Sequence, residues 1–154
     1  VDLSGSTNEL PGVTSGALDI TCLKDGIPAF MGEMGQGGKV ERPYINAAKR
    51  GILNVMIYLG MKEGEIVRPE RQVLITKRRF LRIGQGGFMT MRVAPGDEIP
   101  EGTAMLDIHY YGDNVEEIKA AGNYYMIGTR ENPVVSTGDR IAFVGTEWQD
   151  WMES

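Results

Sequence analysis

The chain has 154 residues, of which 42% are hydrophobic and 24% are charged, a balance typical of a globular protein rather than a disordered one. Lysine and arginine number 16 against 21 aspartates and glutamates, so the formal net charge is −5 and bulk electrostatics argue against a nucleic-acid-binding protein. No apolar run approaches the roughly 18 residues of a membrane-spanning helix. The first residues lack the charged and apolar regions of a signal peptide, so we expect neither a membrane span nor a secretion signal.

Two residue counts limit the chemistry. Cys22 is the one cysteine, so no internal disulfide can form, a reducing compartment fits best, and we expect a cytoplasmic protein. His109 is the one histidine. A catalytic zinc ion takes about three protein ligands from histidine, cysteine and carboxylates. Because the histidine and the cysteine are far apart in sequence, we expect no metal site and no bound cofactor in this chain.

The first predicted elements are a short helix and a short strand. Residues 15–24 place apolar side chains as a helix would, and the following Asp25-Gly26 is typical of a left-handed helix end. The apolar run Ile27-Pro-Ala-Phe-Met31 then has the length of a buried strand. Within it, Pro28 must lie at the start of the strand or on a sheet edge.

The clearest predicted helix follows a glycine-rich loop. Pro43 suits the first turn of a helix, and Gly60 suits its end. Between them, apolar residues recur at three- and four-residue intervals and form one face: Ile45, Ala48, Ile52, Val55, Met56 and Leu59. Helix, strand, loop and helix together indicate an α/β segment.

The pattern changes after a polar stretch at 61–71. From Gln72 onward, short β segments alternate with Gly, Pro and Asp, which predicts a small sandwich or barrel. The candidate strands are 72–76, 80–83, 87–93, 104–110, 115–119, 124–129 and 140–144. We therefore expect two domains, an α/β segment at 1–66 and an all-β domain at 67–154.

The β-rich part contains a weak internal sequence repeat. The segment Val93-Ala-Pro-Gly-Asp-Glu-Ile99 resembles Val135-Ser-Thr-Gly-Asp-Arg-Ile141, each with a Gly-Asp turn before an apolar strand start. Two similar halves predict a pseudo-twofold β unit with the barrel-sandwich layout of biotinyl/lipoyl-like domains. The tip that would carry the modified lysine in such a domain, 110–114, has no lysine. We expect Lys119, several residues later, to be a plain solvated lysine.

The loop Gly32-Glu-Met-Gly-Gln-Gly-Gly-Lys39 holds the main candidate for catalysis. It fits neither a Walker loop nor a dinucleotide-binding loop, because the glycine spacing is wrong and Val40 replaces Ser or Thr. Glu33 would end a buried strand among four glycines, where a desolvated carboxylate can act as a general base. A surface glutamate in a flexible loop is an equally weighted alternative. A second Gly-Gln-Gly-Gly, at 84–87, is interpreted as turn geometry.

Three other motifs receive structural interpretations. Cys22 has no base near it in sequence, which favours a small buried thiol. Asp107 and His109 alternate along a strand and are interpreted as a surface pair. The basic run Lys77-Arg78-Arg79 with Arg82 could hold a carboxylate or a phosphate, although a solvated strand edge is the default.

Two motifs in the right order resemble the succinylglutamate desuccinylase/aspartoacylase family. The first is Gly26-Ile-Pro-Ala-Phe-Met-Gly-Glu-Met-Gly-Gln-Gly-Gly38, similar to the family's "G-I-P-A" strand and "E-x-G-x-G-G" loop. The second is Arg50-Gly-Ile-Leu-Asn-Val-Met-Ile-Tyr-Leu-Gly60, similar to the helix that follows. The resemblance covers most of 11–145 and includes the β-rich tail.

The resemblance implies a zinc-dependent amide hydrolase with a zinc-carboxypeptidase-like catalytic domain and a barrel-like C-terminal domain. It gives Glu33 the role of assisting the attack of zinc-activated water on the amide. The family's His-x-x-Glu metal motif has no match here. We therefore expect the C-terminal part of such an enzyme, with the zinc ligands upstream of this chain and the isolated chain inactive.

The implied substrate is a small N-acyl amino acid or a similar amide, with no nucleic-acid or membrane partner. Homo-oligomer formation is left open. The alternative is a non-catalytic binding or interaction module.

Overall fold

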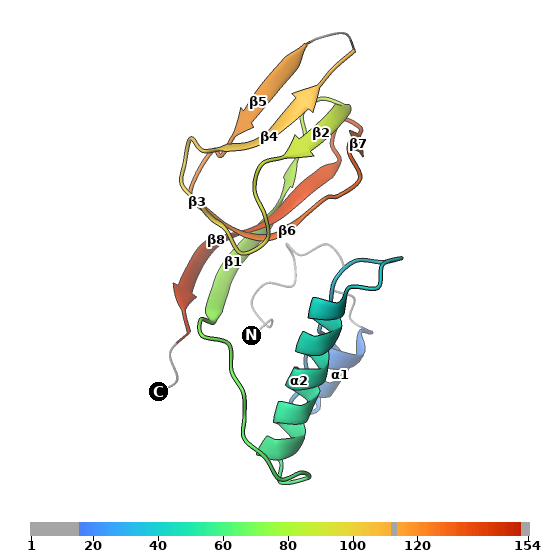
Figure 1. Cartoon of the computed structure of the whole chain (residues 1–154), viewed down its shortest axis with the longest axis vertical. Helices are drawn as coiled ribbons and strands as arrows, with labels where there is room; N and C mark the ends of the chain where they lie inside the picture. Colours follow the sequence, from blue (N-terminus) through green and yellow to red (C-terminus); the bar gives the residue numbers. More distant parts are fainter. Residues whose placement is uncertain (1–15, 112–113, 152–154) are drawn as a thin grey trace. The chain divides into compact units, whose positions relative to one another are not determined.

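The computed structural model describes residues 16–111 and 114–151 (Figure 1). The chain separates into two compact units, the first ending at Glu70 and the second beginning at Arg71. Unit 1 contains helices α1 (Leu18–Lys24) and α2 (Arg42–Tyr58). Neither helix is long and apolar enough to cross a membrane, as holds for every helix in the described part.

Both helices of unit 1 end as the sequence predicts. After α1, Gly26 takes a φ of 74°, and the N–H of Ile27 donates to the carbonyl of Cys22 at 2.8 Å. After α2, Gly60 takes a φ of 69°, and the N–H of Met61 donates to the carbonyl of Met56 at 2.9 Å. These are Schellman ends, in which a left-handed glycine lets the chain satisfy the last carbonyl groups of the helix.

The prediction of a buried strand at Ile27–Met31 is wrong. These residues form no strand, and the side chains of Phe30 and Met31 are 80% and 64% exposed. An extended segment becomes a strand only when another strand pairs with its backbone, and no described segment pairs with this one. The apolar face of α2 is at most half-buried within unit 1, since none of the helix residues is fully buried.

Unit 2 consists of two four-stranded antiparallel sheets, ordered β1-β8-β6-β3 and β5-β4-β2-β7 (Figure 1). The strands are β1 (Val73–Arg82), β2 (Gly87–Met91), β3 (Glu98–Ile99), β4 (Ala104–His109), β5 (Val115–Lys119), β6 (Tyr124–Thr129), β7 (Val134–Val135) and β8 (Arg140–Asp150). The described strands form two separate sheets rather than a closed barrel. With the helices of unit 1, the fold is mixed α/β.

The core of unit 2 is apolar throughout its described part. Its most deeply buried side chains are Leu106, Ile108, Met126 and Val144. No polar or charged residue is buried among the described residues. Along β6 buried and half-buried positions alternate at first, as the period of two predicts, whereas β4 and β8 also contain pairs of adjacent buried residues.

The predicted internal repeat corresponds to two equivalent turns. The carboxylate of Asp97 accepts the N–H of Ala94 at 2.8 Å, and that of Asp139 accepts the N–H of Ser136 at 2.9 Å. The glycine before each aspartate has a positive φ, 98° at Gly96 and 85° at Gly138. Each turn leads into a strand, so the sequence repeat is a repeat of structure.

The two halves of unit 2 also exchange strands. The short strand β3 of the first half pairs with β6 of the second, and β7 of the second half pairs with β2 of the first. The two sheets correspond strand by strand. In order, β1, β8, β6 and β3 of one sheet match β5, β4, β2 and β7 of the other. The arrangement is therefore pseudo-twofold.

Three strand predictions need correction. Segments 72–76 and 80–83 belong to one strand, because the basic residues between them pair with β8 through register shifts. Strand β8 continues past 144 to Asp150 for the same reason, since β1 supplies partners along its length. Strands β3 and β7 were not predicted, because two residues are too few to show a period.

Candidate functional site

Glu33 lies in the irregular segment between α1 and α2, and its side chain is exposed. The expected strand before it is absent, so strand packing does not fix its position within unit 1. Two of the four neighbouring glycines have left-handed backbones, with φ of 67° at Gly35 and 80° at Gly38. The path of the loop therefore depends on glycine at these two positions.

The glycine loop is tied to the start of helix α2 by a carboxylate that sequence reasoning missed. Oε2 of Glu41 accepts the backbone N–H of Gln36 at 2.9 Å. A Cβ on Gly35 would lie 2.7 Å from the same oxygen and 3.1 Å from the ring of Tyr44. Glu41 directly precedes the helix, where a negative charge is favourable, and that position is the signal that could have found it.

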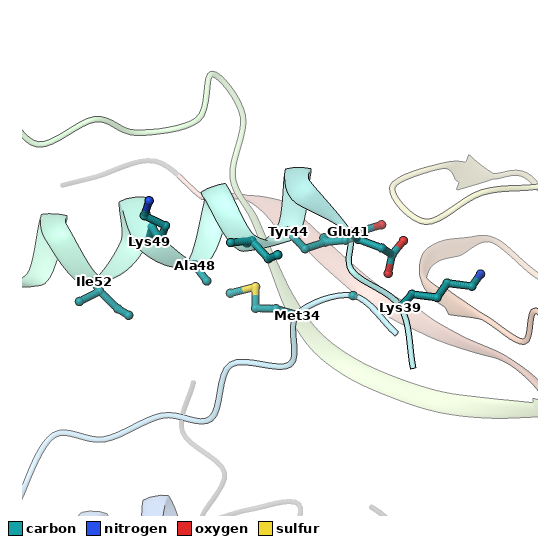
Figure 2. A pocket seen from close by; sticks show the side chains of 9 residues that line it. Met34, Lys39, Glu41, Tyr44, Ala48, Lys49 and Ile52 are labelled. Carbon is teal, nitrogen blue, oxygen red and sulfur yellow. The ribbon is translucent and has the colours of Figure 1, made fainter. Parts of the chain in front are cut away.

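A cavity of about 240 Å³ lies beside this loop, within unit 1. It is lined by Met34, Gly35, Lys39, Glu41, Tyr44, Ile45, Ala48, Lys49 and Ile52. Figure 2 shows the side chain of Met34 close to Tyr44 and Ala48 of the helix, with Glu41 and Lys39 at one end. The cavity therefore combines an apolar floor with charged groups. Glu33 does not line it.

The described residues do not fit a catalytic zinc ion. No group of three or more His, Cys, Asp or Glu side chains among them could hold a metal. Cys22 is half-buried in α1 of unit 1, whereas His109 is exposed at the end of β4 in unit 2. No step of catalysis can therefore be derived through zinc from these residues.

The expected surface pair of Asp107 and His109 is not formed. Instead, the carboxylate of Asp107 accepts two hydrogen bonds from the guanidinium of Arg92, both at 2.8 Å. These bonds raise the pKa of Arg92, and a further bond at 2.8 Å joins the same guanidinium to Glu117. Arg92 rather than His109 pairs with Asp107, because the planar guanidinium group can donate to both oxygens of a carboxylate at once.

Comparisons with known proteins bear on the fold. No model of a protein family matches the sequence, and no curated protein matches it. Among solved structures, a succinylglutamate desuccinylase from a Silicibacter species matches with a TM-score of 0.73 and 22% identity, over 89% of this chain and 43% of that one. A succinylglutamate desuccinylase/aspartoacylase from Rhodobacter sphaeroides matches with a TM-score of 0.72 and 21% identity, over 87% and 43%.

The ectoine utilization protein EutE (DoeB) from Ruegeria pomeroyi gives a similar match, with a TM-score of 0.71 and 22% identity over 87% of this chain and 44% of that one. The resemblance predicted from the sequence motifs is thus confirmed at the level of the fold. The chain spans less than half the length of each of these structures.

Proposed function

We propose that this chain is part of a deacylase that hydrolyses the amide bond of a small N-acyl amino acid or a related compound. The observation that carries the proposal is the fold shared over 87–89% of the chain with proteins named as desuccinylases and aspartoacylases. The glycine loop and the adjacent cavity are compatible with it, because they offer space for a small ligand beside the carboxylate of Glu41, although Glu33 itself does not line this cavity.

Glu33 is proposed as the general base and acid of this reaction. Its carboxylate would take a proton from the attacking water as oxygen bonds to the amide carbon. The resulting carboxylic acid would return that proton to the amine nitrogen as the carbon–nitrogen bond breaks. Such assistance is typically worth about 10²–10⁴-fold in rate.

The proposal has further parts, which concern zinc, the activity of the chain alone, the type of the second domain and the location. They rest on the resemblance and on composition. Zinc would be held by residues outside this chain, and the chain alone would be inactive. Residues 67–154 would form a biotinyl/lipoyl-like domain, which the exchange of strands between its halves supports. A cytoplasmic location is supported by the single cysteine.

The test is a glutamine substitution in the full-length parent. Glu33→Gln keeps the shape of the side chain and removes its basic oxygen, so kcat for release of the free amine from N-acyl amino acids should fall by about 10²–10⁴-fold. Glu63→Gln, at an exposed glutamate of the same unit, is the matched control and should leave kcat unchanged. Near-normal kcat in the Glu33→Gln protein would remove Glu33 from the mechanism.

A non-catalytic binding module is the second candidate. It is favoured by an array of arginines on unit 2. A parent that binds N-acyl amino acids without hydrolysing them would favour this candidate over the deacylase.

A further inference from the structure

Strands β1 and β8 bring two phenylalanines together on the face of their sheet that points away from the core. Phe80 and Phe143 are direct cross-strand partners, and their rings stack with centroids 4.4 Å apart. Ala142 and Val144, on either side of Phe143, belong to the core. Side chains alternate between the faces of a strand, so Phe143 and its partner lie on the outer face.

Two arginines extend this aromatic pair. The guanidinium carbon of Arg140 lies 4.4 Å from the ring centre of Phe80, and that of Arg78 lies 5.7 Å from the ring centre of Phe143. Stacking on a ring uses the flat face of a guanidinium group and leaves its N–H edge able to bind a carboxylate. The rings therefore hold two cationic groups in place without neutralising them.

A third arginine places like charges opposite each other. Arg82 is the direct cross-strand partner of Arg140, and like charges at such positions destabilise a sheet. Arg82 donates to the carbonyl of Gly138 at 2.6 Å. Within the described part of the chain, none of these three arginines forms an ion pair with a carboxylate.

The neighbouring basic residues of β1 differ in this respect. Lys77 forms an ion pair with Glu147 at 2.6 Å, and Arg79 donates to the hydroxyl group of Tyr124, over whose ring its guanidinium lies. Of these two residues only Lys77 is neutralised by a carboxylate, whereas Arg79 keeps its charge but is held on the opposite face of β1 by a neutral tyrosine.

We propose that the arginine ladder, defined as Arg78, Arg82, Arg140, Phe80 and Phe143, is a docking surface for an acidic polypeptide segment. The charge is complementary, because the ladder is cationic on a chain whose net charge is −5. A bound carboxylate would also relieve the repulsion between Arg82 and Arg140. This inference does not depend on the proposed deacylase function.

The geometry favours a polypeptide over a small anion. Arg78 and Arg82 are four residues apart on one strand, which corresponds to about 13 Å in an extended chain. An extended peptide with acidic residues at alternate positions has those side chains on one face about 6.6 Å apart, so every second one matches the separation of Arg78 and Arg82. The arginines lie along a sheet face rather than around a cavity, so they do not converge on one small ligand.

The test uses fluorescence anisotropy with the whole chain and a labelled peptide of about nine residues in which glutamate alternates with serine. We expect saturable binding that weakens as salt is raised, because exposed charges are screened. Arg78→Gln combined with Arg140→Gln should raise Kd by at least about fivefold, since each exposed ion pair contributes modestly. Lys24→Gln combined with Lys62→Gln makes the same change in net charge in unit 1 and should leave Kd unchanged.

Several results would overturn the proposal: no binding of the glutamate peptide, equal binding by the arginine double variant, or equal binding of a peptide with glutamine in place of glutamate. Displacement of the peptide by citrate at the same carboxylate concentration would assign the surface to a small polycarboxylate instead. The arginine double variant keeps Arg82 and its bond to Gly138, and a cooperative thermal transition will show that it is folded.

Discussion

At the scale of single residues, two positions of unit 2 require glycine because neighbouring backbone atoms leave no room for a side chain. A Cβ on Gly87 would lie 2.6 Å from the carbonyl oxygen of His109, and one on Gly86 would lie 2.9 Å from that of Val135. Gly84, at the start of the same Gly-Gln-Gly-Gly motif, has no atom within 4 Å of the corresponding position. The motif therefore serves the packing of β2 against its neighbours as well as a turn.

These contacts predict unequal costs for one substitution. Gly87→Ala should destabilise the chain by about 1–3 kcal/mol, because backbone atoms must move to admit the methyl group. Gly84→Ala should change stability by no more than about 0.5 kcal/mol. Urea denaturation followed by tryptophan fluorescence, to which Trp148 and Trp151 both contribute, measures both. Equal costs at the two positions would contradict the contact geometry.

Tyr110 gives a prediction about pH. Its hydroxyl group donates to a carboxylate oxygen of Glu116 at 2.6 Å, and this bond raises the pKa of Tyr110 above its ordinary value. A raised pKa in the folded state means that the stabilisation is complete below about pH 10 and is lost as the pH rises through the folded-state pKa. Tyr110→Phe should therefore lower Tm at about pH 8 and matter progressively less above about pH 10.

The control for this prediction is the neighbouring tyrosine. Tyr111 is fully exposed, so Tyr111→Phe should leave Tm unchanged at each pH. A difference between wild type and Tyr110→Phe that grows as the pH rises above about 10 would mean that the bond to Glu116 does not stabilise the fold.

At the scale of elements, the glycine loop and helix α2 are joined through Gly35 and Glu41. Gly35→Ala should displace the Glu41 carboxylate, because the new methyl group would overlap it and the left-handed backbone disfavours alanine. We expect faster hydrogen exchange at the N–H of Gln36, measured by NMR. Gly37→Ala, with nothing within 4 Å of its Cβ, should leave that exchange rate unchanged.

The elements that could be predicted are those fixed by local chemistry. The ends of both helices follow from Gly26 and Gly60, whose backbone freedom requires no partner elsewhere. The equivalent turns at Asp97 and Asp139 are likewise local, since each carboxylate bonds to a backbone N–H three residues away. Most strands of unit 2 show their period in the sequence because one face of each sheet is buried.

The elements and contacts that could not be predicted depend on partners distant in sequence. The apolar run at Ile27–Met31 has the composition of a strand, but pairing decides whether a strand forms. The continuity of β1 through its basic residues follows from its pairing with β8. The stacking of Phe80 on Phe143 and the opposition of Arg82 to Arg140 require the register between strands nearly 60 residues apart in sequence. Local sequence patterns within either strand do not predict that register.

The candidate site was predictable only in part. The resemblance pointed to Glu33, whose role remains a prediction, and the glycines around it did mark an unusual backbone. The bond from Gln36 to Glu41 joins a loop to the start of a helix, so no pattern within either segment alone predicts it. Burial of Glu33 was expected from a strand that unit 1 does not form.

At the scale of the whole molecule, burial is uneven between the two units. Every buried residue in the described part belongs to unit 2, whereas no described residue of unit 1 is buried. Apolar burial is the main source of folding stability, so unit 1 should open far more readily than unit 2. Limited digestion with trypsin should therefore leave a resistant fragment that begins between residues 63 and 72.

Mass spectrometry of the digest identifies that fragment. Cleavage after Lys62 is expected, whereas Arg68 is followed by Pro69 and resists trypsin. Cleavage after Arg71 should be slower, because this arginine forms ion pairs with Glu98 and Asp150. A stable fragment that retains helix α2 would show that unit 1 is protected after all.

The strand order of the two sheets also bears on aggregation. Their outermost strands are β1, β3, β5 and β7. Two of these have only two residues, β5 carries Glu116, Glu117 and Lys119, and β1 carries a run of three basic residues. Short or charged edges are poor templates for an incoming strand, which limits the growth of a sheet from molecule to molecule. A polypeptide partner is therefore expected to meet side chains on a sheet face rather than an unpaired backbone.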